Sequence, residues 1–380
     1  MRTSFKTAAL ACWIALAGAL PLSTVSAELR QEADEIAGPG DIERATLQSD
    51  IEAILAKHCV EGAYIAVTMG TDTVLARSYG RTPATGEAFS GTTKVRLASA
   101  SKLLTAVTVA SLRQAGVVSL EETLGALIPD APEAWRDIPV WRVLNHTSGL
   151  PMVVIREDFN AMDPESLERI SAAQVRAMIE DEPLDFKPGE QWRYQQSGYA
   201  LLAEALAARL GTTWRDLVQT RIVEAAGLRS TDFGNAAAVF EVRDEKVVPH
   251  TFLYPELFAP AGGFETTGED ARRLLVALAS GQVLTEDSLR SLTNDHRWIE
   301  TREGDAQGAG YGPGVAVQRF GDTAFFSHCG GGGLADIRFA PERQLGIAVL
   351  TNRAGGTGAA IEVADLIATR FLGEPKREAG

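Results

Sequence analysis

One segment, 99–115, constrains the fold of this chain most strongly, because apolar residues occupy nearly every face of the helix that it predicts. Only the small residues Thr105, Thr108 and Ser111 interrupt the apolar pattern. A helix that is apolar all round is buried in the middle of a domain. Gly116 follows as the expected end of the helix. The sequence therefore predicts a central helix that other elements cover on all sides.

Segments with strand patterns lie at both ends of the chain, and helix patterns fill the middle. A helix is predicted at 44–57, followed by two strands at 63–69 and 73–79 that a Gly-Thr-Asp turn joins. Strands near the other end are predicted at 314–320, 323–328, 335–340 and 345–351, before a last helix at about 359–371. Further helices are predicted at 174–180, 198–210 and 268–278.

This order of elements predicts the fold class α/β (α+β), with an antiparallel sheet flanked by helices. The sheet would be built from the N- and C-terminal segments, with a helical domain inserted between them. The expected boundaries are a flexible lead-in at 28–43, a folded unit at 44–372 and a tail at 373–380. Within the folded unit we expect a sheet subdomain at 44–116 plus 301–372 and a helical subdomain at 117–300.

The first 27 residues have the pattern of a secretory signal peptide. Arg2 and Lys6 supply positive charge, 7–22 is apolar, and small residues allow cleavage after Ala27. The alternative is a membrane anchor, but the uninterrupted apolar stretch is shorter than a bilayer requires. We therefore expect a periplasmic or secreted protein that has no membrane contact after cleavage.

Charge and composition exclude several classes of function. A net charge of −14 and the lack of a basic run argue against nucleic-acid binding. The five histidines have no metal-ligand spacing, so neither a metal nor another cofactor is expected. A chain cleaved after Ala27 would keep only Cys59 and Cys329, too few for a disulfide scaffold.

Two residues in the first turn of the central helix, Ser99 and Lys102, form a candidate nucleophile and base. Positions i and i+3 share one helix face, which would bring Ser99 Oγ and Lys102 Nζ within hydrogen-bonding reach. Burial lowers the pKa of a lysine, so a neutral amine could take the serine proton. The alternative is an N-cap serine with an exposed lysine, which the apolar helix disfavours. The Ser99 N–H, at the helix start, would be available to an oxyanion.

Two other clusters contain candidate site residues. Tyr194 precedes a predicted helix and could carry a proton to a leaving group; the alternative is a packing aromatic residue. His328 and Cys329 end a strand and are followed by four glycines, 330–333. Glycines let a substrate lie close to the backbone and leave N–H groups available, although a flexible turn would have the same pattern.

Several motifs follow one another in a set order: VRLASASK at 95–102, LNHTSGL at 144–150, Pro188-Gly189 before Tyr194, GYALL at 198–202, AGG at 261–263, Tyr311-Gly312 and LTNR at 350–353. Together they resemble the large family of class C β-lactamases, serine DD-peptidases and related esterases. The resemblance covers about residues 44–372 and implies the fold of that family.

The resemblance also implies a role for each matching residue. Ser99 would be the acylated nucleophile, Lys102 the general base and Tyr194 the second proton carrier. The backbone N–H groups of Ser99 and Gly331 would form the oxyanion hole. Substrate-binding positions would be Gln196, His328, Cys329 and Gly330. His146, in a loop that supports the site, is expected to be structural.

Two departures from the family pattern bear on the substrate. Gln196 stands where the family has the Asn of Tyr-x-Asn, and its side chain is one methylene longer. His328 and Cys329 stand in place of the Lys-Thr of a Lys-Thr-Gly strand. A neutral imidazole attracts a carboxylate less than an ammonium does. Histidine here resembles the peptidase and esterase branches more than efficient β-lactamases.

The resulting expectation is a serine hydrolase that cleaves an amide, peptide or ester bond through an acyl-serine intermediate. A peptidase or amidase of the DD-peptidase type is the first choice, with a small-molecule or peptide substrate. A carboxylesterase and a weak β-lactamase are the next candidates. A non-catalytic ligand- or penicillin-binding protein is the alternative from another class. The sequence predicts no oligomeric state.

Overall fold

An antiparallel sheet forms the centre of the molecule in the computed structural model, which describes residues 41–244, 246–250, 253–294, 299–300, 310–354 and 358–376. The signal-peptide prediction at 1–27 and most of the lead-in lie outside these residues. In sheet order the strands are β2 (Asp72–Gly80), β1 (Gly62–Met69), β13 (Leu345–Thr351), β12 (Ala335–Ala340), β11 (Thr323–Gly330), β10 (Ala316–Phe320), β9 (Gly310–Tyr311) and β8 (Ile299–Glu300). A further short strand, β14 (Pro375–Lys376), pairs with β10.

The N- and C-terminal segments meet inside this sheet, as the sequence predicts. β1 pairs with β13 in antiparallel register, from Ala63 opposite Thr351 to Met69 opposite Leu345. The fold class is therefore confirmed. The structure reproduces the predicted bounds of β12 and β13 without change, because the alternating pattern of β12 and the apolar run of β13 are each bounded by clear turn residues.

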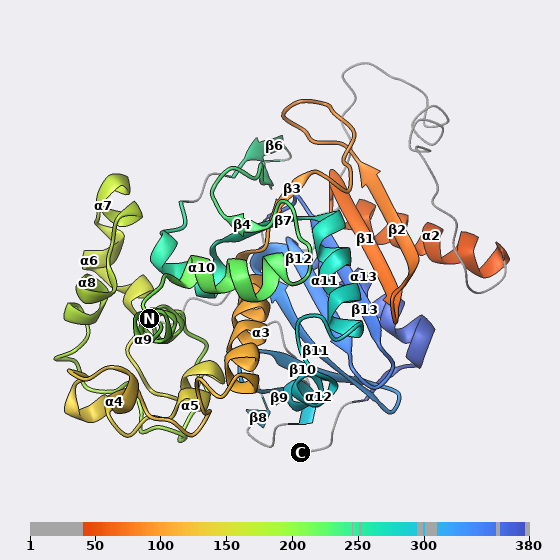
Figure 1. Cartoon of the computed structure of the whole chain (residues 1–380). Coiled ribbons are helices and arrows are strands. Elements are labelled where there is room, and N and C mark those ends of the chain that lie inside the picture. Colours follow the sequence, from red (N-terminus) through yellow and green to blue (C-terminus); the bar gives the residue numbers. More distant parts are fainter. Residues whose placement is uncertain are drawn as a thin grey trace.

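Helices cover both faces of the sheet (Figure 1). On one face, α2 (Asp41–Lys57) and α13 (Ala359–Leu372) pack against alternate strand residues such as Ile65 and Val67. Their neighbours Tyr64 and Ala66 point to the other face and join the core around α3 (Ser101–Gln114) and α11 (Gly268–Ala279). The alternation follows from the two-residue period of a strand.

The remaining helices lie beyond α3, on the side away from β1 and β2 (Figure 1), or at the far edge of the sheet. They are α4 (Leu124–Leu127), α5 (Val140–Leu144), α6 (Glu157–Asn160), α7 (Pro164–Glu168), α8 (Ala172–Ala177), α9 (Ser197–Arg209), α10 (Trp214–Val218) and α12 (Glu286–Asn294). Two smaller sheets are also present. One consists of β3 (Lys94–Arg96), β7 (Phe264–Thr267) and β4 (Asp232–Phe233), and the other is a hairpin of β5 (Phe240–Arg243) and β6 (Lys246–Pro249). The subdomain boundaries stay a prediction. The helix α11 lies within the segment expected as the helical subdomain, 117–300, and packs on β1 and β13 of the main sheet.

The central helix is present and buried, with one difference from the prediction. Every residue from Ser101 to Leu112 of α3 is buried. Ser99, however, lies in a separate 3-10 turn, Ala98–Ala100, that leads into the helix. Gly116, at a positive φ of 70°, follows the helix end as predicted.

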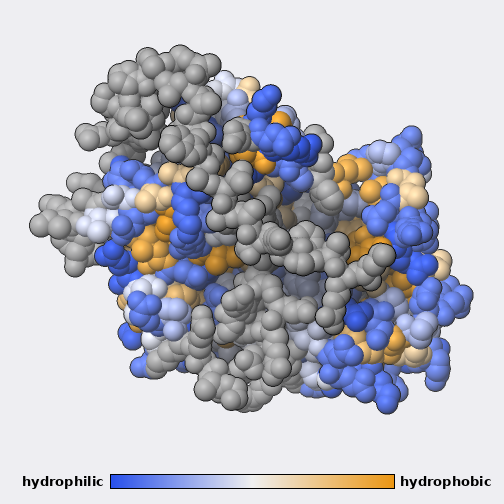
Figure 2. All heavy atoms as spheres, turned by 180° about the vertical axis from the view of Figure 1, so that it is seen from behind, coloured by the Kyte–Doolittle hydropathy of each residue, from blue (hydrophilic) through white to orange (hydrophobic). Residues whose placement is uncertain are grey.

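The coloured surface seen from behind mixes hydrophilic and hydrophobic side chains, and hydrophilic ones predominate along the right-hand edge (Figure 2). Within the described ranges, no helix is long and apolar enough to cross a membrane. The same residues contain no group of His, Cys, Asp and Glu side chains that could hold a metal ion. Cys59 and Cys329 do not form a disulfide with each other.

Candidate active site

The turn that carries Ser99 is held by the small sheet beneath it. Leu97 N–H donates to the Phe264 carbonyl at 2.9 Å, and Phe264 N–H donates to Ser101 Oγ at 3.0 Å. Between them, Ala98 has a φ of 46°, in the left-handed region. This conformation costs a residue with a Cβ roughly 1–2 kcal/mol, and such strain is concentrated at functional sites. The backbone therefore fixes Ser99 in a tight turn.

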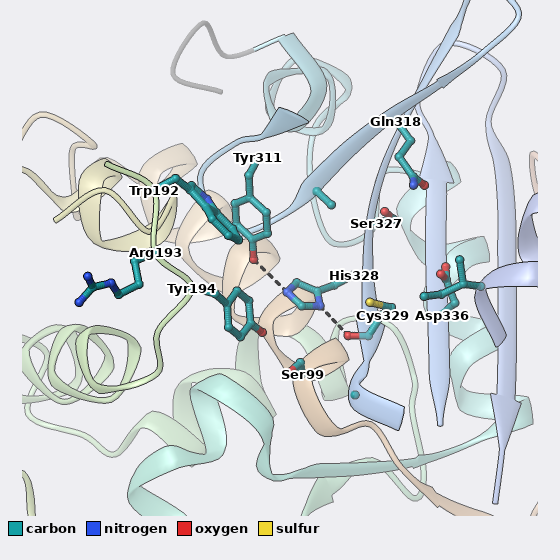
Figure 3. A pocket seen from close by; sticks show the side chains of 13 residues that line it. Ser99, Trp192, Arg193, Tyr194, Tyr311, Gln318, Ser327, His328, Cys329 and Asp336 are labelled. Atoms are coloured by element: carbon teal, nitrogen blue, oxygen red, sulfur yellow. Dashed lines mark hydrogen bonds between the residues drawn. The ribbon is translucent and has the colours of Figure 1, made fainter. Parts of the chain in front are cut away.

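A cavity of about 340 Å³ opens beside Ser99 (Figure 3). It takes residues from the nucleophile turn, from the loop before α9 and from strands β9 to β12. Its lining residues are Ser99, Trp192, Arg193, Tyr194, Tyr311, Ala316, Gln318, Ser327, His328, Cys329, Gly331, Asp336 and Ile361. Five of the residues singled out in the sequence therefore share one cavity: Ser99, Tyr194, His328, Cys329 and Gly331.

Lys102 lies at the base of the site and is completely buried. Its Nζ donates to the Ala261 carbonyl at 2.7 Å and lies 4.6 Å from the Tyr194 ring centroid and 5.2 Å from that of Tyr199. Burial lowers the pKa of Lys102 from 10.5 to about 7, and the nearby Cys329 thiol only partly opposes this shift. A large fraction of the side chain is therefore a neutral amine at neutral pH.

The expected hydrogen bond between Ser99 and Lys102 is not present among the described residues. Lys102 Nζ donates its hydrogen bond to the Ala261 carbonyl instead. A buried amine needs a partner, and the backbone turn at 259–263 supplies one close at hand. Side chains in catalytic sites often align fully only when substrate is bound.

Tyr194 lines the same cavity as Ser99, and its pKa depends on burial and on the nearby Ser99 hydroxyl. Burial raises the pKa of Tyr194 well above its usual value, and the Ser99 interaction lowers it by a smaller amount. Tyr194 Oη makes no hydrogen bond of good geometry within the described part of the chain. The phenol is therefore a protonated donor that points to the nucleophile (Figure 3).

His328 is neutral, and its tautomer follows from its two partners. Nδ1 lies 2.8 Å from the Cys329 carbonyl, which can only accept, so Nδ1 carries the proton. Nε2 then accepts from the Tyr311 hydroxyl at 2.9 Å (Figure 3). Burial and the nearby Lys102 lower the pKa of His328 to about 3. This side chain therefore adds no positive charge to the cavity at physiological pH.

The end of β11 brings the glycines next to the nucleophile turn. A Cβ on Gly330 would lie 2.3 Å from the Leu97 carbonyl oxygen, so only glycine allows this approach. Gly331 begins a short 3-10 turn and lines the cavity with Ser99. The first N–H groups of a helical turn have no partner within it. Ser99 and Gly331 therefore both line the cavity, each within a short 3-10 turn.

Gln196 does not line the cavity. Its Oε1 accepts a hydrogen bond of 2.6 Å from the Tyr254 hydroxyl. Tyr254 belongs to the loop at 235–260, in which the sequence has no motif to single it out. Tyr311, by contrast, was part of the ordered motifs, although its contact with His328 was not predicted.

His146 is buried beneath the site and packs among four aromatic rings. The centroid distances are 4.5 Å to Tyr194, 4.8 Å to Tyr311, 5.2 Å to Tyr199 and 5.8 Å to Trp192. Nδ1 accepts from Gln195 N–H at 3.3 Å, and burial keeps the pKa of His146 well below its usual value. A neutral ring in this position supports the tyrosines by packing.

A sheet flanked by helices, with a serine turn and a tyrosine at one cavity and a buried lysine at its base, defines a β-lactamase-fold serine hydrolase. The family described as Beta-lactamase matches residues 47–370. The chain therefore belongs to the β-lactamase family.

Relatives by sequence include penicillin-binding proteins. Penicillin-binding protein 4 of Amycolatopsis lactamdurans is 26% identical over 341 residues, which cover 82% of this chain and 85% of that protein. Penicillin-binding protein 4* of Bacillus subtilis (strain 168) is 29% identical over 191 residues, or 50% of this chain. That match spans only 41% of the length of the Bacillus protein.

Solved structures confirm the fold. The octameric penicillin-binding protein homologue from Pyrococcus abyssi has a TM-score of 0.72 and 21% identity, over 88% of this chain and 78% of its own. The D-amino acid amidase from Ochrobactrum anthropi SV3 complexed with D-phenylalanine has a TM-score of 0.71 and 22% identity, over 86% of this chain and 99% of its own.

Proposed function

We propose that this serine hydrolase cleaves the amide bond of a peptide or of a D-amino-acid-containing amide, through an acyl intermediate on Ser99. The observation that carries the proposal is the buried Lys102, whose pKa of about 7 makes it a base at neutral pH beside the nucleophile turn. A general base works best when its pKa lies near the working pH.

In the acylation step, neutral Lys102 accepts the Ser99 proton as Oγ attacks the substrate carbonyl. The negative charge that develops on the carbonyl oxygen is bound by the N–H groups of Ser99 and Gly331. Tyr194, protonated because of its raised pKa, donates a proton to the leaving amine. Lys102 then returns a proton to Tyr194. Water completes the cycle by attacking the acyl-serine ester, which releases the acid and restores Ser99.

The charge of the cavity supports an amide without a terminal carboxylate. His328 is neutral, and Lys102 is turned to the Ala261 carbonyl. Arg193 lines the cavity, but its guanidinium points away from it (Figure 3) and pairs with Asp185 at 2.7 Å. The likeness to a D-amino acid amidase also supports this substrate class. A carboxylic ester ranks second and a β-lactam third.

We also propose that the enzyme acts in the periplasm or outside the cell. The proposal rests on the positive charge, apolar stretch and small residues of the first 27 residues. Expression of the full chain should yield a mature protein that begins at Glu28, as read by mass spectrometry. A full-length protein in the cytoplasm would contradict it.

Side-by-side rates on four kinds of substrate test the proposed reaction. The panel is D- and L-phenylalanine amide, a D-alanyl peptide, a short-chain nitrophenyl ester and nitrocefin, each with wild type and Ser99→Ala. We expect D-phenylalanine amide to have the highest kcat/KM, because it has no terminal carboxylate, and Ser99→Ala to be inactive. A higher value for the D-alanyl peptide would contradict the argument from the charge of the cavity. A higher value for the ester would favour a carboxylesterase, and a higher value for nitrocefin would contradict the ranking.

A further inference from the structure

We infer that Tyr254 is a positioning residue, whose hydroxyl holds the Gln196 side-chain amide in one orientation beside the active site. The inference rests on the proposed function, because it concerns how the same site receives an acyl group. Neither residue lines the cavity beside Ser99, and Tyr254 lies in a loop without a sequence motif.

The contact itself is short and partly buried. Tyr254 Oη donates to Gln196 Oε1 at 2.6 Å, and the tyrosine is 9% exposed. Burial raises the pKa of Tyr254, so the phenol stays a neutral donor over the working pH range. Because Oε1 already accepts the Tyr254 hydroxyl, the two hydrogens on Gln196 Nε2 remain available as donors. The amide is therefore oriented as a donor, which suits a carbonyl oxygen on the substrate.

Asn235 fixes the backbone of Tyr254. Tyr254 N–H donates to Asn235 Oδ1 at 3.0 Å, and Asn235 Nδ2 donates to the Tyr254 carbonyl at 3.2 Å. Asn235 Oδ1 also accepts from Arg96 Nη2 at 3.1 Å. Arg96 ends β3, three residues before Ser99. The tyrosine is therefore tied to the strand that leads into the nucleophile turn.

The other side of the phenol rests on the backbone that supports Lys102. A Cβ on Gly262 would lie 2.3 Å from Tyr254 Oη, so the ring packs directly on this glycine. The preceding residue, Ala261, supplies the carbonyl that accepts from Lys102 Nζ. Tyr254 thus lies between the Gln196 amide and the turn that holds the base.

The length of the Gln196 side chain explains why such a partner is needed. Glutamine has one more rotatable bond than asparagine, and ordering it costs more side-chain entropy. An unpaired amide in a buried place costs about 1–3 kcal/mol, which favours an orientation with a partner. The Tyr254 hydroxyl supplies that partner, and it would compensate for the extra methylene at this position.

A matched pair of inhibitors tests this inference without knowledge of the natural substrate. Acetamidomethylboronic acid and methylboronic acid both form a bond from boron to Ser99 Oγ, and only the first carries an amide carbonyl. The measured quantity is the ratio of their inhibition constants against nitrophenyl acetate hydrolysis. The variants are Tyr254→Phe, Gln196→Leu and the double variant, with Tyr79→Phe on β2 as a control for loss of a partly buried phenol.

We expect Tyr254→Phe to reduce the preference for the acetamido compound, measured as the ratio of the two inhibition constants, by about tenfold. This factor corresponds to the free energy of one or two hydrogen bonds. Methylboronate inhibition and the pH midpoint of hydrolysis should stay as in wild type. The double variant should be no worse than Gln196→Leu alone, because both changes remove the same contact. Tyr79→Phe should leave the ratio unchanged.

An unchanged ratio in Tyr254→Phe, or additive losses in the double variant, would overturn the inference. An equal loss for both boronates would also overturn it, because it would indicate a general structural role. Failure of wild type to hydrolyse the ester, together with failure of both boronates to bind Ser99, would instead contradict the proposed function.

Discussion

At the scale of single residues, the site depends on what burial does to three ionisable side chains. Lys102 loses much of its charge, His328 loses all of it, and Tyr194 keeps its proton. The shared cause is desolvation, which disfavours the charged form of each group. The result is a base and an acid of suitable protonation next to Ser99, with no positive charge from His328.

The pKa of Lys102 predicts the pH dependence of acylation. The base form is the neutral amine, so kcat/KM should rise with pH and reach half its maximum near pH 7, close to the pKa of about 7. Lys102→Arg should lower kcat/KM by at least about a hundredfold, because a guanidinium stays protonated. A pH profile of nitrophenyl ester hydrolysis measures both. An unshifted profile in Lys102→Ala would show that another base works, with Tyr194 the first to examine.

His328→Lys should change the preference of the enzyme toward carboxylate-bearing substrates. The new ammonium could form a charge-assisted hydrogen bond with the carboxylate of a β-lactam, which predicts an increase of about tenfold in acylation by benzylpenicillin relative to a neutral ester. Stopped-flow acylation rates check this, with His328→Gln as the uncharged control. Equal ratios in the two variants would show that charge at this position does not select the substrate.

At the scale of elements, the end of β11 and the turn before α3 depend on one close approach. Gly330 ends β11 and lies against the Leu97 carbonyl, and the next residue, Gly331, lines the cavity. The 3-10 turn at 98–100, with Ala98 at positive φ, brings Ser99 to the same point. Neither element forms the site alone.

Gly330→Ala should therefore disturb both stability and acylation. The new Cβ must move the strand or the turn, which should lower the free energy of unfolding by about 1–3 kcal/mol. The reaction of Ser99 with a fluorophosphonate probe should slow by more than about tenfold. Gly331→Ala is the matched control for stability, since its Cβ would meet nothing within 4 Å. Thermal unfolding and the rate of labelling measure the difference. Equal melting temperatures for the two variants would contradict the packing account.

At the scale of the whole molecule, a buried ionic network joins the sheet to the last helix. Arg338 is 1% exposed and donates to Asp336 Oδ1 at 2.7 Å and Oδ2 at 3.1 Å, both on β12. It also donates to Asp365 on α13 at 2.5 Å. Asp336 also lines the cavity beside Ser99, so this network ties the cavity wall to α13.

Arg338→Leu should destabilise the fold by about 3–5 kcal/mol, because it leaves Asp336 buried and unpaired. The double change with Asp336→Leu should recover much of the loss. Arg370→Leu is the exposed control: its pair with Asp50 is about 40% exposed on both sides, so a loss below about 1 kcal/mol is expected. Urea unfolding followed by tryptophan fluorescence gives the three values, and equal losses for Arg338→Leu and Arg370→Leu would contradict the network's role.

Local patterns predict the parts of the fold that depend on burial alone. The all-apolar α3 and the strands β12 and β13 have such patterns, and the structure contains them with little change. The contacts of Lys102 with Ala261 and of Gln196 with Tyr254 join residues far apart in the chain. No periodicity specifies such partners, because tertiary packing selects them. The separate turn at Ser99 was likewise hidden, since Ala98 has no sequence feature that indicates a positive φ.

The most direct test of the central claim is the mass of the protein after reaction with a fluorophosphonate probe at pH 8. The account predicts a single adduct on wild type, mapped by peptide mass spectrometry to Ser99, and no adduct on Ser99→Ala. Lys102→Met should label at least about tenfold more slowly. Equal labelling of wild type and Ser99→Ala would contradict the account.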